Sequence, residues 1–300
     1  MKKLHLIFLT AIISGFSIFI NKFGVSMGNP YVFTFLKNSA VFVFLFSLIL
    51  LFNEFKHFKK LKKQDWMKLI TIGLVGGSIP FLLFFKGLSL TTSAKGAFIH
   101  KTMFVYVVVF AYFFLKEKFN WRIILASAAL IFGNLLFLRV SWEPFNIGDL
   151  MILGATLFWA AENTLSKYTL KNVPSKIVAF SRMFFGSIFI LMFLVATGNF
   201  ADLLVLTKDQ LLWSIVPSVL LGLYVLTWYT GLKDVPVTLA SAILLLGSPI
   251  TTLLNVLHAG VTLNLSQVTG IVFLVLGVVT FMYSVDSIKI SRPNKILFKV

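Results

Sequence analysis

Apolar segments of about 20 residues recur along this 300-residue chain, separated by short polar connections. A helix of that length crosses a hydrocarbon core of about 30 Å, because an α-helix rises about 1.5 Å per residue. Only 12% of the residues are charged, against about a quarter in soluble domains. The sequence therefore predicts an all-α, polytopic membrane protein with ten transmembrane helices. The expected spans are 4–23, 31–52, 66–88, 93–115, 121–140, 147–166, 177–197, 211–232, 237–257 and 265–284.

The distribution of the 27 Lys and Arg residues predicts the orientation. Most of them fall at the N-terminus, in NEFKHFKKLKKQD (53–65) and in other connections on the same side of the membrane. Cytoplasmic connections carry such an excess, so both termini are expected in the cytoplasm, with the protein in the plasma membrane. The net charge of +17 would also suit nucleic acid, but the cations cluster between apolar segments, and no nucleic-acid partner is expected. The N-terminal apolar run is too long for a signal peptide and is read as a retained first helix.

The chain also matches itself weakly but continuously at an offset near 145 residues. INKFGVSMGNPYVFTFLKNSA (20–40) lies over LSKYTLKNVPSKIVAFSRMFF (165–185), which pairs Lys37 with Arg182. Each copy holds five spans, and because five is odd, the second copy enters the membrane upside down. We expect two inverted five-helix repeats, 1–145 and 146–288, followed by a basic cytoplasmic tail, 289–300.

The span count, the cytoplasmic termini and the repeat resemble the EamA-type members of the drug/metabolite transporter superfamily. LFWAAENTLSKY (157–168) resembles the sixth-helix pattern of that family. LKEKFNWRIILASAALIFGNLLF resembles its fourth-to-fifth helix junction, with Glu117 as the usual acidic residue. Lys37 and Arg182 match a basic residue early in the second helix of each repeat. The resemblance implies a secondary transporter of a bacterial or archaeal plasma membrane, with export as the expected direction.

The sequence departs from the family pattern at two positions. LLLGSPITTLL in the second half carries the usual proline, Pro249, but Val105 stands at the aligned position of the first half. Val261 replaces the second acidic residue. Pro80, Pro217 and Pro249 are expected to interrupt their helices.

Two adjacent ionisable residues, His100 and Lys101, lie within the apolar stretch AFIHKTMFVYVVVFAYFFLKEK (97–118). Lys101 is about eight residues, or roughly 12 Å, inside its span, too deep for its amine to reach the membrane surface easily. Adjacent helical residues diverge by about 100°, so at least one of the two should face the bundle interior or a water-filled cavity. Lys101 is expected to line such a cavity. His100 is either a second binding residue or a hydrogen-bonded packing residue.

Other cations lie nearer to the ends of their spans. Lys37 and Arg182 are each about six residues, or roughly 9 Å, from one membrane surface, so that both a functional and a snorkelling position remain open. Lys22, Lys86 and Lys95 are close enough to an end to snorkel.

Glu162 is the only acidic residue well inside a predicted span. The repeat alignment gives two stripes with i, i+3, i+7 spacing on equivalent helices: Ser14, Ser17 and Asn21 in the first half, and Trp159, Glu162 and Ser166 in the second. Such stripes are what a lined cavity would need. Glu162 is interpreted either as a fixed counter-ion for Arg182 or Lys101, or as a proton carrier that couples transport.

These observations define a predicted site. The expected substrate-binding residues are Lys101, His100, Lys37, Arg182, Trp159, Ser17, Asn21, Tyr106 and Trp228, with Glu162 as the coupling residue. The chain lacks a phosphate-binding loop, paired catalytic residues, cysteine and any His spacing typical of a metal site, so neither an enzyme nor a cofactor is expected.

The predicted function is movement of a small metabolite, an amino acid or an organic anion, by alternating access. An anion is favoured because the membrane-embedded cations outnumber the acids, and an unpaired buried cation is costly. The alternatives are proton-coupled efflux of hydrophobic cations and, in another class, a non-transporting membrane enzyme or scaffold. The expected partners are a small-molecule substrate and the lipid bilayer, with the chain a monomer or homodimer.

Overall fold

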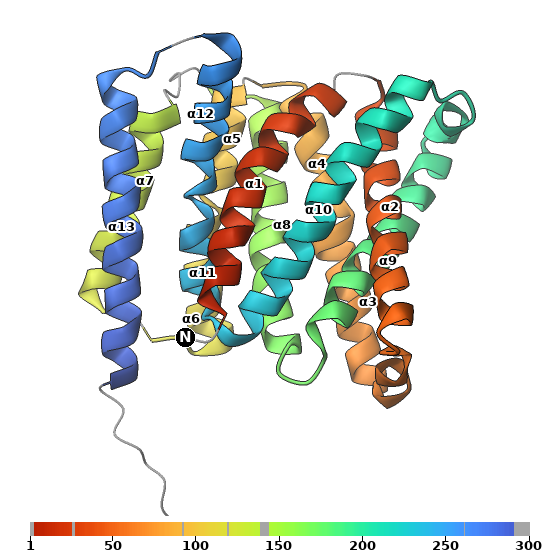
Figure 1. The fold of residues 1–300 in the computed structure, drawn as a ribbon, viewed down its shortest axis with the longest axis horizontal. Coiled ribbons are helices and arrows are strands. Elements are labelled where there is room, and N and C mark those ends of the chain that lie inside the picture. The colour runs from red at the N-terminus through yellow and green to blue at the C-terminus, as the bar shows by residue number, and fades with distance from the viewer. Residues whose placement is uncertain are drawn as a thin grey trace, which may run out of the picture.

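The computed structural model describes residues 3–25, 28–91, 93–118, 120–138, 144–260 and 262–290, and every regular element among them is a helix (Figure 1). In chain order these are α1 (Leu4–Val25), α2 (Pro30–Leu51), the 3-10 helix η1 (Phe55–Lys60), α3 (Lys63–Gly77), α4 (Ile79–Leu88), α5 (Ser93–Lys101), α6 (Met103–Leu115), α7 (Trp121–Leu138), α8 (Ile147–Thr169), α9 (Ser175–Ala196), the 3-10 helix η2 (Asn199–Leu204), α10 (Lys208–Asp234), α11 (Val237–Leu244), α12 (Gly247–Ala259) and α13 (Leu265–Ile290). The all-α prediction is confirmed. Most of the expected tail, 289–300, lies outside the described residues.

Nine helical rods in the described part of the chain are long and apolar enough to cross a membrane, counting α3–α4, α5–α6 and α11–α12 as one rod each. The remaining predicted span, 147–166, corresponds to α8, which is 23 residues long but is not among the nine. It carries Asp149, Glu162 and Lys167. Because α8 packs against α3, α4, α5 and α6, Asp149 and Glu162 are fully buried inside the bundle.

Three rods are broken, two of them at equivalent positions of the repeat. Thr102 separates α5 from α6, and residues 245–246, about 144 positions further along, separate α11 from α12. Ser78, with φ −130° and ψ −74°, separates α3 from α4, and Pro80 follows as the second residue of α4. Pro217 lies inside the continuous helix α10, so the expectation that it interrupts its helix is wrong.

Pairs of packed helices are preserved when each helix is replaced by its equivalent in the other half of the chain. α1 packs against α10, and its repeat equivalent α8 packs against α4, which belongs to the rod equivalent to α10. Likewise, α3 packs against α9 while α10 packs against α2. The pairs α2–α9 and α7–α13 each join a helix to its own equivalent. Two upside-down copies packed face to face produce this pattern.

At several crossings among the described residues, helix backbones come into direct contact through glycine. A Cβ on Gly186 of α9 would lie 2.5 Å from the carbonyl oxygen of Gly77 in α3. A Cβ on Gly270 of α13 would lie 2.7 Å from the carbonyl oxygen of Gly133 in α7. Small residues at such crossings allow the close approach that holds membrane helices together by van der Waals contact.

The bundle has two distinct ends. In Figure 1 the start of α1 and the end of α13 both lie at the lower end, which we call the terminal face. The upper end is called the opposite face, where α1, α4, α7 and α12 finish and α2, α5, α8 and α10 begin.

Candidate functional site

A cavity of about 500 Å³ lies between the two halves of the bundle. Its wall includes side chains of α1, α2, α4 and α5 from the first half and of α8, α9, α11 and α12 from the second. Leu88, Ala97 and Leu138 belong to its lining, and all three lie near helix ends at the opposite face. The cavity therefore extends from the bundle interior toward that face, and its volume suits a small molecule.

Most of the residues expected to bind substrate lie around this cavity. Its lining includes Lys101, His100, Lys37, Arg182, Trp159, Ser17 and Asn21. Tyr106 and Trp228 are not part of it. Tyr106 packs against the apolar core, and Trp228 is 1% exposed behind Tyr224, whose ring stacks on it at 6.3 Å and does line the cavity. The binding role of the lining residues stays a prediction.

The break in the fourth rod explains how His100 and Lys101 are accommodated. They are the last two residues of α5, where the negative end of the helix dipole favours cations. The amine of Lys101 has no hydrogen-bond or ion-pair partner among the described residues. The His100 ring stacks on Trp159 at 5.0 Å and meets Phe84 edge-on at 5.1 Å, while its Nδ1 is buried without a hydrogen bond to any described group.

The break between α3 and α4 supplies a backbone acceptor to the inner wall of the cavity. The carbonyl of Gly76 would normally accept a hydrogen bond from residue 80, but Pro80 has no N–H to donate. The freed carbonyl instead accepts from Trp159 Nε1 at 3.1 Å and from Arg182 Nη2 at 3.1 Å. A proline in one helix thus orients two cavity residues from the other half of the chain.

Glu162 lies behind this wall, fully buried and outside the cavity lining. Its Oε1 accepts hydrogen bonds from Ser166 Oγ at 2.5 Å and Tyr229 Oη at 2.6 Å. Its Oε2 lies 4.0 Å from Nη1 of Arg182, which also donates to Tyr229 Oη at 3.3 Å. Of the two interpretations of Glu162, the geometry matches the counter-ion of Arg182, and its coupling role stays a prediction.

Lys37 has a different environment, rich in aromatic rings. Its amine donates to Asn21 Oδ1 at 3.3 Å and lies 4.9–5.5 Å from the ring centres of Phe33, Phe81 and Phe85. The side chain is 2% exposed, so the snorkelling interpretation does not describe it in this conformation. Cation–π contacts of this kind offset part of the cost of burying an ammonium group.

The snorkelling prediction fails for Lys95 and stays a prediction for Lys86. Lys95 is 5% exposed and forms an ion pair of 2.6 Å with Asp149, near the opposite face. Asp149 also accepts from Thr91 Oγ1 at 2.6 Å. Lys86 is exposed. The side chain of Lys22 lies outside the description.

Sequence reasoning missed several residues of the cavity wall. Phe81 meets Lys37, Arg182 and the ring of Trp159, and the preceding Pro80 was the one available signal. The polar residues Asn163, Tyr224, Ser241, Ser248 and Thr252 also line the cavity. No group of His, Asp and Glu side chains in the described part of the chain gathers into a metal site.

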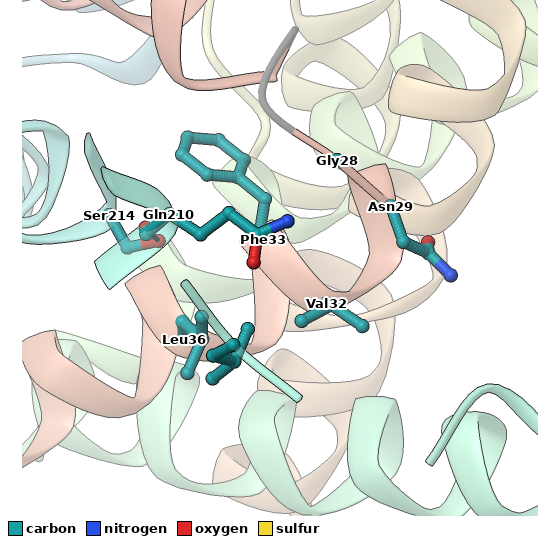
Figure 2. Close-up of a pocket in the computed structure, with 8 residues that line it drawn as sticks. Gly28, Asn29, Val32, Phe33, Leu36, Gln210 and Ser214 are labelled. Atoms are coloured by element: carbon teal, nitrogen blue, oxygen red, sulfur yellow. Dashed lines mark hydrogen bonds between the residues drawn. The ribbon is translucent and has the colours of Figure 1, made fainter. Parts of the chain in front are cut away.

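A second pocket, of about 20 Å³, lies between the starts of α2 and α10 at the opposite face (Figure 2). Gly28, Asn29, Phe33, Gln210 and Ser214 are among the residues around it. Its volume suits about one water molecule, so it is not a second candidate site.

Comparison with known proteins identifies the family. The profile of the EamA-like transporter family matches residues 1–139 and again residues 146–283. This chain belongs to the EamA-like transporter family.

Two relatives are named as transporters, and one solved structure has a similar fold. The chain is 26% identical to an uncharacterized transporter of Clostridium kluyveri over 228 residues, 73% of this chain and 72% of that protein. It is 20% identical over 227 residues to an uncharacterized transporter of Methanothermobacter thermautotrophicus, 72% of this chain and 64% of that protein. A crystal structure described only as that of a protein superposes with a TM-score of 0.76 at 16% identity, over 95% of this chain and 98% of that one. At that identity the likeness supports the fold alone.

The two EamA-like segments both contribute to the cavity. Lys37 and Lys101 come from the first match, and Trp159 and Arg182 from the second. The cavity therefore lies where the two family repeats meet, as the substrate sites of many repeat-built transporters do.

Proposed function

We propose that this EamA-like chain is a secondary transporter that moves a small organic anion or amino acid across the plasma membrane by alternating access. The observation that carries the proposal is a cavity that is lined by three cationic side chains and extends toward the opposite face of the bundle. Lys37, Lys101 and Arg182 line it, and no Asp or Glu is found among the described lining residues. An anion entering this low-dielectric site would lower the cost of those buried charges.

Closure at the other end supports alternating access. The Glu117 carboxylate accepts hydrogen bonds from the N–H of Val237 at 3.0 Å and the hydroxyl of Thr238 at 2.6 Å. The Lys167 amine donates to the carbonyls of Leu232 at 2.6 Å and Val235 at 2.7 Å. We call these contacts the terminal seal. With the termini in the cytoplasm, as the basic connections favour, the cavity would face outward in this conformation.

A second candidate is efflux of hydrophobic cations coupled to protons at Glu162. The aromatic side chains of the wall, including Phe81, Phe84 and Trp159, favour it because cations bind to ring faces. The position of Glu162 behind Arg182 weighs against it, because a cation in the cavity would meet the guanidinium first. Export is the direction that the family resemblance favours.

Counterflow in proteoliposomes tests the proposal. The panel would contain amino acids, organic anions and lipophilic cations, with and without a pH gradient. Lys101→Ala should abolish anion counterflow, whereas Lys86→Ala should leave it unchanged, because Lys86 is exposed and outside the cavity. Flux of cations alone, or equal effects of the two variants, would contradict the proposal. Absence of all flux from correctly folded protein would favour a non-transporting membrane protein.

A further inference from the structure

The internal repeat places two equivalent polar clusters in the bundle. The first contains Ser17, Asn21 and Lys37, and the second contains Glu162, Ser166 and Arg182, with each member 145 residues from its counterpart. In the first cluster Asn21 Nδ2 donates to Ser17 Oγ at 3.1 Å, and Lys37 donates to Asn21 Oδ1 at 3.3 Å. In the second, Ser166 donates to Glu162, which faces Arg182. Each cluster thus joins two residues one helical turn apart to a cation on the following helix.

The clusters differ in charge. Arg182 has a carboxylate, Glu162, within 4.0 Å, so the second cluster contains one charge of each sign. The position equivalent to Glu162 is occupied by Ser17, and Lys37 has no carboxylate partner among the described residues. Lys37 is nevertheless 2% exposed, and an ammonium group buried among rings and one amide oxygen lacks the anion that would offset its desolvation.

The first cluster is also the accessible one. Ser17, Asn21 and Lys37 all line the 500 Å³ cavity, whereas Glu162 and Ser166 lie outside its lining. The missing negative charge is therefore at a place that a solute can reach. Phe81 and Phe85, whose rings lie beside the Lys37 amine, continue the wall and would contact an apolar body attached to the charged group.

We propose that Ser17, Asn21 and Lys37 form a subsite for the carboxylate of the transported solute. This carboxylate lies beside Lys37 as the Glu162 carboxylate lies beside Arg182. This inference rests on the proposed transport of anions and narrows its substrate class. The preferred solute is an organic acid with an apolar or aromatic body. An amino acid fits less well, because no Asp or Glu among the described lining residues meets its ammonium group.

Binding to the purified, detergent-solubilised protein tests the subsite separately from transport. The probes are benzoate, benzamide and benzylamine, which share one ring and carry a negative, neutral and positive group. Tryptophan fluorescence can report binding, since Trp159 lies in the wall. We expect benzoate to bind at least about tenfold more tightly than the other two probes.

The decisive variant is Ser17→Glu, which places a carboxylate where the repeat has Glu162. We expect Ser17→Glu to weaken benzoate binding by at least about tenfold, because the new carboxylate pairs with the Lys37 amine in place of benzoate. The thermal unfolding midpoint of this variant should equal or exceed that of the wild-type protein, a result that would show that the variant is folded. Thr252→Glu is the matched control, since it adds the same charge to the same cavity from α12 and should weaken binding by less than about threefold. Lys37→Gln should resemble Ser17→Glu.

Each contrary result has a definite meaning. Equal weakening by Ser17→Glu and Thr252→Glu would overturn the subsite, because only the general field of the cavity would then matter. Failure of the wild-type protein to prefer benzoate over benzamide would overturn it as well. In both cases anion counterflow by the same preparation would leave the transport proposal standing, whereas absence of any flux would remove the transport proposal.

Discussion

The two ends of the bundle are built from equivalent helices, but they differ in the contacts that hold the helix ends together. At the terminal face, Glu117 and Lys167 bind the backbone around the turn from α10 to α11, and the cavity does not reach the helix ends there. At the opposite face the cavity extends to Leu88, Ala97 and Leu138. Contacts at that face include the buried Lys95–Asp149 pair, neither residue of which lines the cavity.

Under the proposed alternating access, the difference indicates which contacts should break. The terminal seal consists of hydrogen bonds made by the partly exposed side chains of Glu117 and Lys167, and water can replace these bonds when helices separate. The Lys95–Asp149 pair is buried on both sides, and breaking it would leave two charges in low dielectric. We therefore expect the seal to be the moving part and the buried pair to be a fixed part of the scaffold.

The largest expected effect concerns the buried pair. Asp149→Ala would leave the Lys95 ammonium without its carboxylate, and removal of one partner of a buried ion pair costs about 3–5 kcal/mol. Thermal unfolding in detergent should show a large drop of the midpoint. The matched control is Asp234→Ala, because Asp234 pairs with Lys3 at 3.4 Å with side chains that are 34% and 42% exposed. That variant should cost at most about 1 kcal/mol. Similar losses in the two variants would contradict the distinction between fixed and surface contacts.

A smaller effect is expected at Lys167, with a signature in accessibility. Lys167→Ala removes the amine that donates to the carbonyls of Leu232 and Val235 and should destabilise the closed terminal face by about 1.5–3 kcal/mol. Because the chain has no cysteine, a single Ser241→Cys in the cavity wall can report opening. In the Lys167→Ala background it should react faster with a membrane-impermeant thiol reagent confined to the terminal side.

Lys171→Ala is the control for this measurement. Lys171 is exposed four residues later, where its amine lies 5.2 Å from the centre of the Tyr168 ring. Its removal should leave the labelling rate of Ser241→Cys unchanged. An equal increase in both variants would mean that loss of positive charge, rather than loss of the seal, changes the labelling.

Much of this architecture could be predicted because it follows from short-range patterns. Apolar runs of membrane length define the rods, and the alignment of Lys37 with Arg182 reveals the repeat. The depth of Lys101 in its span was sufficient to predict a cavity. The stripe of Ser17 and Asn21 appeared at helical spacing, and both residues line the cavity.

The missed features depend on partners far apart in the sequence. The place of Lys95 near the end of its span predicts a position at the membrane surface. Its carboxylate partner, Asp149, is 54 positions away and belongs to the other repeat, so the local sequence gives no sign of the ion pair. The break between α5 and α6 at Thr102 has no proline beside it, so the sequence gives no signal of this break. Trp228 was expected in the wall, but the rotation of α10 directs Tyr224 into the cavity instead, and a helix that is apolar all round gives no signal of its rotation.

The smallest expected effect tests whether the terminal seal is more than a helix cap. Glu117 accepts from the first N–H of α11 and from the Thr238 hydroxyl, and loss of such a cap costs about 0.5–2 kcal/mol. Glu117→Ala should therefore lower the thermal midpoint slightly and raise the labelling of Ser241→Cys from the terminal side by less than Lys167→Ala does. Glu117→Gln keeps an acceptor oxygen and should lie between Glu117→Ala and the wild type in both measurements. If Glu117→Ala lowers the midpoint without changing the labelling, the carboxylate stabilises α11 in every conformation, and Lys167 alone distinguishes the closed end from the open one.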